Sequence, residues 1–291
     1  MERKTHIDTF GTIALTVFAI ALSFNQVVIK VTNGGFSPVF SAGIRSLIGL
    51  TAVALWMAYR RKAFGRSAPV VRAGILAGIL FSLEFICLYI ALDLTTVSRA
   101  SIIFYSMPVW LALVAHVFLP GERLNAVRLL GLVLAMTGVI VAVMDRQGGE
   151  ASLWGDLFAL GAAIFWGGIA LVVRLTPLSQ EKPETQLIWQ LIVSSIVLIA
   201  VAPLFGPLLR DPQAIHVAGL MFQAIGIVAI AYLIWFWLLT IYPASGVASF
   251  SFLSPVFSVL LGWWLLGEQV GLSIWLALVL VALGIILINR R

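Results

Sequence analysis

Two charged residues lie deep inside long apolar stretches of this sequence, which makes them the first candidates for chemistry. Arg45 lies in the apolar stretch 36–59 and Glu84 in the stretch 70–92. At 1.5 Å per helical residue, each would be about 13 Å deep in a membrane. Charges at that depth are rare and are candidates for function. Either Glu84 binds an ammonium group or a proton while Arg45 binds a carboxylate, or the two form a buried structural pair.

Prolines stand at matching places in two other apolar stretches. Pro108 lies in Ser-Met-Pro-Val-Trp and Pro255 in Leu-Ser-Pro-Val-Phe, near the middles of the stretches 97–119 and 245–266. A proline inside a helix removes one backbone hydrogen bond and frees the carbonyl four residues earlier. We expect each to be a hinge or to expose a carbonyl to a cavity; simple bending around neighbouring helices is the alternative.

Four further charged residues lie near the ends of apolar stretches. Glu122 and Glu268 each follow a glycine just before an apolar stretch, where a carboxylate can cap the positive end of a helix. We expect capping from both, not substrate binding. Lys30 and Arg174 lie where long side chains reach toward the membrane surface, with a gate as the alternative role.

Aromatic side chains are numerous, with ten Trp, eighteen Phe and five Tyr. Most should face lipid or lie in the interfacial belts. A subset could line an apolar cavity with few polar groups, which suits a neutral or zwitterionic aromatic solute. The candidate substrate-binding residues, together with Glu84, are Asn25, Gln26, Tyr89, Tyr105, Trp166, Tyr232 and Trp237.

Hydropathy predicts the elements that hold these residues. The chain is 62% hydrophobic and only 10% charged over 291 residues, whereas soluble domains carry roughly 25% charged residues. A helix needs about 20 mostly apolar residues to cross a bilayer. We therefore predict an all-α integral membrane protein with ten transmembrane helices, at approximately 10–31, 36–59, 70–92, 97–119, 126–144, 153–175, 184–205, 214–239, 245–266 and 271–288.

Basic residues predict the orientation. With the N-terminus inside, thirteen of the eighteen Lys and Arg residues face the cytoplasm and four face the other side. This bias follows the positive-inside rule, so both termini should be cytoplasmic.

The sequence also repeats itself. The two proline motifs are offset by 147 residues, Gly138 aligns with Gly284 at an offset of 146, and Gly11 aligns with Gly155 at an offset of 144. We predict two five-helix repeats, residues 1–147 and 148–291. Because five is odd, the second repeat must enter the membrane inverted, which is typical of transporters that work by alternating access.

In these motifs the chain resembles the EamA-type branch of the drug/metabolite transporter superfamily. Trp166-Gly167 with Arg174 matches the start of the family's repeat, although Leu22-Ser23 replaces Trp-Gly in the first repeat. Arg45 matches the family's arginine early in helix 2. The resemblance implies ten helices in two inverted repeats. Within the family, the chain resembles the YddG-type exporters of aromatic amino acids of bacterial inner membranes.

Together these features predict a secondary transporter that exports amino acids, aromatic and other apolar ones, across a bacterial inner membrane. A multidrug or organic-cation exporter is the alternative within transport, although the stretch 10–31 has no acidic residue. Outside transport, the alternatives are a membrane receptor, a structural protein or an intramembrane enzyme.

Several other classes are disfavoured by the sequence. No catalytic constellation lies within the apolar stretches, so an enzyme is not expected. No P-loop and no Cys/His cluster is present, so neither ATP nor a metal or other cofactor is expected. The net charge of +6 fits cytoplasmic loops better than nucleic acid. The expected partners are a small-molecule substrate and the lipid bilayer, with a monomer sufficient and an oligomer allowed.

Overall fold

The computed structural model describes residues 7–118, 125–145, 152–242 and 250–289. Within these ranges the ordered elements are helices, and the one pairing of extended backbone is an isolated bridge between Phe36 and Leu209. The predicted all-α class is confirmed. The predicted repeat boundary at 147/148 and the expected cap Glu122 lie outside the described residues.

Four helices begin where the sequence offers a start signal. Asp8, Thr96, Asn125 and Ser152 each accept a hydrogen bond from the backbone N–H three residues later, which satisfies one of the free donors at a helix start. The helices that run without a break are α1 (Thr9–Asn33), α2 (Pro38–Tyr59), α3 (Ala68–Leu94), α6 (Ala126–Met144), α7 (Leu153–Leu175) and α13 (Leu272–Asn289).

The remaining apolar stretches are divided into shorter pieces. A turn at residues 105–106 divides one stretch, and a change of helix type divides the other three. A short 3-10 helix, η1 (Pro177–Gln180), follows α7. The divided stretches are α4 (Val97–Phe104) with α5 (Met107–Phe118), α8 (Pro183–Val201) with the 3-10 helix η2 (Ala202–Phe205), α9 (Ala214–Met221) with the π-helix η3 (Phe222–Ala231) and α10 (Tyr232–Ile241), and the 3-10 helix η4 (Phe250–Phe252) with α12 (Leu253–Leu266).

The two prolines stand at helix starts and not in the middle of continuous helices. Pro108 is the second residue of α5, after α4 has ended at Phe104, and Pro255 lies in the first turn of α12, after the 3-10 turn η4. A proline is tolerated in a first helical turn because the N–H that it lacks would have had no partner there. The expected kinks are therefore breaks, which expose backbone ends within the bundle.

Eight helices are long and apolar enough to cross a membrane in the part of the chain that the structure describes, and two shorter apolar helices accompany them. The shorter ones are Leu253–Leu266 and Leu272–Ile288. The chain is thus a multi-pass membrane protein, while the count of ten spans stays a prediction.

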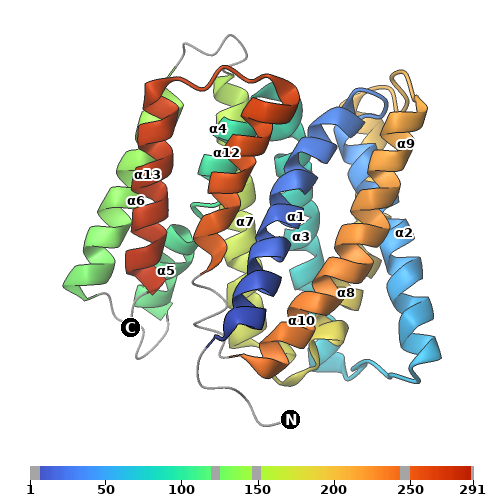
Figure 1. Ribbon diagram of the computed structural model, residues 1–291. Coiled ribbons are helices and arrows are strands. Elements are labelled where there is room, and N and C mark those ends of the chain that lie inside the picture. Colours follow the sequence, from blue (N-terminus) through green and yellow to red (C-terminus); the bar gives the residue numbers. More distant parts are fainter. Residues whose placement is uncertain (1–6, 119–124, 146–151, 243–249, 290–291) are drawn as a thin grey trace.

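The helices form one bundle with two ends (Figure 1). Helix α1 begins and α13 finishes at the same end, which we call the terminal end; the opposite end, where α4 and α13 begin, is the far end. Helices α6 and α13 lie side by side at one edge, and α2 lies at the other.

Four helix pairs account for much of the packing. Helix α1 packs on α12 and α4 packs on α7, while α2 packs on α8 and α6 packs on α13. Glycines allow the closest approach in the last pair, because a Cβ on Gly284 would lie 2.6 Å from the Gly131 carbonyl and one on Gly138 would lie 2.7 Å from the Ala277 carbonyl. Such small-residue contacts are the usual means of packing helices in membranes.

Candidate functional site

The two deep charges lie close together in the middle of the bundle. Arg45 of α2 is 1% exposed and Glu84 of α3 is 5% exposed. Electrostatic interaction links the Arg45 guanidinium with the Glu84 carboxylate and with the hydroxyls of Tyr89 and Tyr232. The sequence-based expectation that similar depths allow Arg45 and Glu84 to interact agrees with this placement.

Arg45 is held by an aromatic ring and not by a full set of acceptors. Its guanidinium carbon lies 4.2 Å from the centroid of the Phe85 ring, a cation–π arrangement. The guanidinium also interacts with the neighbouring hydroxyl of Tyr232. Its Nε and Nη1 have no hydrogen-bond partner among the described residues. Buried donors without partners are uncommon in proteins and need an explanation.

Tyr89 is fixed by a residue that the sequence reasoning missed. The Tyr89 hydroxyl donates to Gln223 Oε1, and Gln223 Nε2 donates to Thr32 Oγ1 at 2.9 Å. Gln223 is fully buried in the π-helix η3, and π-helical turns are frequent at functional sites. The sequence did carry a signal for Gln223, because it is a polar residue within the apolar stretch 214–239.

A second polar group surrounds the break between α4 and α5. Tyr105 lies at the break and is 4% exposed, and its hydroxyl interacts with the side chains of Gln26 and Ser254. The side-chain oxygens of Asn25 and Gln26 in α1 are buried and have no partner among the described residues. Ser23 donates to the backbone carbonyl of Ser254 at 2.8 Å, which ties α1 to α12.

Aromatic rings lie beside this second group. Phe104 and Trp166 are stacked, with ring centroids 4.9 Å apart and 16° between the planes. Tyr105 meets both rings edge-on, at 5.2 Å from Phe104 and 6.1 Å from Trp166. Phe104, Tyr105 and Trp166 therefore form one packed aromatic group beside the break.

The two polar groups adjoin each other, because Tyr105 interacts electrostatically with Tyr232. We call them together the central cluster, which consists of Gln26, Arg45, Glu84, Tyr89, Tyr105 and Tyr232. One side carries opposite charges, and the other carries amide and hydroxyl groups beside stacked rings. A solute with a carboxylate, an ammonium group and a ring would therefore find a suitable neighbour for each of these groups in and beside the cluster.

Trp237 is not brought into this cluster. It is 46% exposed on α10, with its ring edge-on to Phe10 at 6.0 Å.

Lys30 of α1 donates to the Thr95 carbonyl at 2.9 Å, so it joins two helices at the far end. Arg174 and His116 are exposed near helix ends.

Glu268 caps a helix, but a different one from the helix we expected. Its carboxylate accepts hydrogen bonds from Val97 N (2.5 Å), Ser98 N (2.9 Å) and Ser98 Oγ (2.6 Å), at the N-terminus of α4. The expected partner was the helix that follows it, α13. Two backbone N–H groups and the positive helix end make this a strong site for a carboxylate. Glu268 thus joins α12 to α4 across the far end.

An ion pair holds the same turn of α4. Arg99 Nη2 lies 2.7 Å from Asp156 Oδ2 of α7, and the two side chains are 3% and 1% exposed. Arg99 also donates to the carbonyls of Asp145 and Val143 at the end of α6. Polar contacts therefore join α4, α6, α7 and α12 at the far end.

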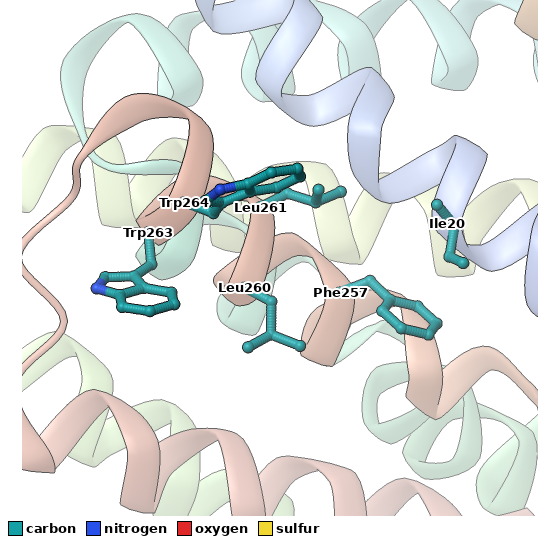
Figure 2. A pocket seen from close by; sticks show the side chains of 6 residues that line it. All are labelled: Ile20, Phe257, Leu260, Leu261, Trp263 and Trp264. Carbon is teal, nitrogen blue, oxygen red and sulfur yellow. The ribbon is translucent and has the colours of Figure 1, made fainter.

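The surface pocket in Figure 2 has a different character. It measures about 330 Å³ and lies between α1 and α12. Trp263 and Trp264 are 56% and 74% exposed there. Its lining, Ile20, Phe257, Leu260, Leu261, Trp263 and Trp264, carries no charged group, which suits lipid acyl chains and not a zwitterionic solute.

No group of three or more metal-ligating side chains lies together among the described residues. The single cysteine, Cys87, is free and half-buried on α3, beside Glu84.

Comparisons with known proteins identify the family of this chain. The model of the EamA-like transporter family matches twice, at residues 9–144 and 153–290. The uncharacterized transporter YoaV of Bacillus subtilis is 23% identical over 279 residues, covering 94% of this chain and 95% of YoaV. A probable amino-acid metabolite efflux pump of Escherichia coli is 26% identical over 294 residues, covering 94% and 93%.

A solved crystal structure shares the fold, with a TM-score of 0.66 at 21% sequence identity and 94% coverage of both chains. The family match extends over nearly the whole described chain. This multi-pass membrane protein therefore belongs to the EamA-like transporter family.

Proposed function

We propose that this chain is a secondary transporter that exports small neutral or zwitterionic solutes, chiefly aromatic and other apolar amino acids. The observation that carries the proposal is the central cluster, in which the buried Arg45 and Glu84 interact with Tyr232. Tyr232 in turn interacts with Tyr105, which lies against the stacked Phe104–Trp166 pair. The two opposite charges complement the carboxylate and the ammonium group of an amino acid, and the aromatic rings complement an apolar side chain. The name of the Escherichia coli relative, a probable amino-acid metabolite efflux pump, points the same way.

The proposed mechanism is alternating access by two inverted five-helix repeats, residues 1–147 and 148–291, that make ten spans. Contacts between aligned positions support it. A Cβ on Gly11 would lie 2.7 Å from the ring of Tyr242, and one on the aligned Gly155 would lie 2.8 Å from Thr95. Tyr242 and Thr95 are themselves 147 residues apart, the offset of the proline motifs. The same contact is thus made twice by equivalent positions.

The breaks at Tyr105 and before Leu253 support a site between the repeats. Discontinuous helices near the middle of a transporter commonly present backbone ends to the substrate. Pro108 and Pro255 each stand at the start of the second piece. In this proposal the two prolines hold the helix breaks in place, and the two repeats rotate relative to each other about these breaks.

The described conformation corresponds to a state closed at the far end, held by Glu268 and Arg99. By the distribution of basic residues, the far end would face the periplasm and both termini the cytoplasm of a bacterial inner membrane. Every residue of the central cluster comes from one chain, so a monomer would suffice.

Uptake of labelled phenylalanine, tryptophan, threonine and methionine into proteoliposomes, at two pH values, tests the substrate class. We expect saturable uptake of phenylalanine and tryptophan, and we expect unlabelled aromatic amino acids to inhibit it by competition. Comparison of the two pH values tests for proton coupling. Movement of organic cations without amino acids would instead favour the multidrug alternative, and movement of none would remove the proposed function.

A further inference from the structure

The environment of Arg45 is unusual for a charge that serves only structure. Burying a guanidinium is strongly unfavourable unless acceptors replace the lost water. Arg45 is 1% exposed, yet its Nε and Nη1 have no acceptor among the described residues. Glu84 does not supply one, since neither nitrogen bonds to it. The guanidinium of Arg45 therefore keeps two buried donors that could bind a further acceptor.

The surrounding side chains fix the orientation of Arg45 without satisfying it. The Phe85 ring covers one face of the guanidinium at 4.2 Å, and the Tyr232 hydroxyl is a further neighbour of it. An arginine stacked in this way loses little further freedom when it binds a carboxylate.

A comparison with Arg99 shows what a satisfied arginine looks like in this chain. Arg99 is 3% exposed and donates to both oxygens of Asp156 and to the carbonyls of Asp145 and Val143. Two arginines of similar burial thus differ in whether acceptors are present. The missing acceptors at Arg45 are accordingly a property of that site.

We propose that Arg45 binds a carboxylate group of the transported solute, so that the substrates are carboxylic acids whose ammonium group lies toward Glu84. The proposal rests on the transport function proposed above and narrows its substrate class. It predicts that an amino acid loses affinity when its carboxylate is replaced by an amide, even though its ring and its ammonium group remain.

The test measures binding of phenylalanine and of phenylalaninamide to the purified wild-type protein, together with counterflow of each in proteoliposomes. Hydrogen bonds to a charged group are the strong ones, so we expect phenylalanine to bind about 30- to 100-fold more tightly than the amide. Arg45→Gln should reduce phenylalanine binding by a similar factor and leave amide binding nearly unchanged. The ratio of the two affinities should therefore approach one.

Arg210→Gln is the matched control, because Arg210 is exposed at the far end and pairs with Asp93. It should keep the wild-type ratio. A ratio near one in the wild type, or an unchanged ratio in Arg45→Gln, would overturn the assignment while leaving transport intact. If Arg45→Gln does not fold, the wild-type ratio alone decides. Wild-type protein that binds and moves neither compound would overturn the transport function and this inference with it.

Discussion

Replacing Asp156 by asparagine should destabilise the protein by about 3–5 kcal/mol, because it leaves the buried Arg99 charge without its anion. Both side chains are almost completely buried, and the pair lies at hydrogen-bonding distance through two nitrogens. In a thermal melt of the purified protein in detergent, a loss of this size corresponds to a drop of roughly 6 to 20 °C.

Asp93→Asn is the matched control for this substitution. Asp93 also pairs with an arginine through two hydrogen bonds, but Arg210 is 41% exposed. Hydrogen bonding to Asp93 raises the pKa of the Arg210 guanidinium. Exposed pairs contribute about 0–1 kcal/mol, so the melting temperature should change little. Equal losses for the two variants would show that the Arg99–Asp156 pair does not stabilise the far end.

Replacing Glu268 by glutamine should open the far end. The carboxylate accepts three hydrogen bonds at the start of α4 and lies against its positive end. A neutral amide cannot accept all three. A loss of about 2–3 kcal/mol from the closed state would raise the population of the open state about 30- to 150-fold.

A cysteine at position 101 reports this opening. Ser101 is 1% exposed and lies one turn beyond Ser98 on α4. In a Cys87→Ser background, Ser101→Cys should react slowly with a water-soluble maleimide, and at least about tenfold faster when Glu268→Gln is added. Gln269→Ala changes the exposed neighbour of Glu268 and should have no effect. Unchanged labelling in the Glu268 variant would mean that this contact does not close the far end.

Much of the fold follows from hydropathy. The stretch predicted at 153–175 is α7 (Leu153–Leu175), and the one predicted at 36–59 is α2 (Pro38–Tyr59). The bounds of α7 equal the predicted ones, and α2 differs only in beginning at Pro38 instead of residue 36. Hydropathy reports how apolar a stretch is and not whether its backbone is continuous. The breaks after Phe104 and before Leu253, and the π-helix η3, were therefore missed.

The site was predictable only in its charged members. Arg45 and Glu84 stand out because a charge in an apolar stretch needs a reason. Gln223 is neutral and gives a weaker signal, although it holds Tyr89 in place. The partners of Glu268 lie about 170 residues away in the chain, so only the packing of α12 against α4 identifies them. Helix capping was the right chemistry for Glu268, assigned to the wrong helix.

Counterflow of phenylalanine tests the central claim most directly. Proteoliposomes loaded with unlabelled phenylalanine are diluted into labelled phenylalanine, and internal label is followed over time. A carrier whose central site opens to one side at a time should accumulate label transiently above its equilibrium level, and empty liposomes should not. A monotonic approach to equilibrium would indicate a pore, and no uptake beyond that of empty liposomes would contradict transport through the central cluster.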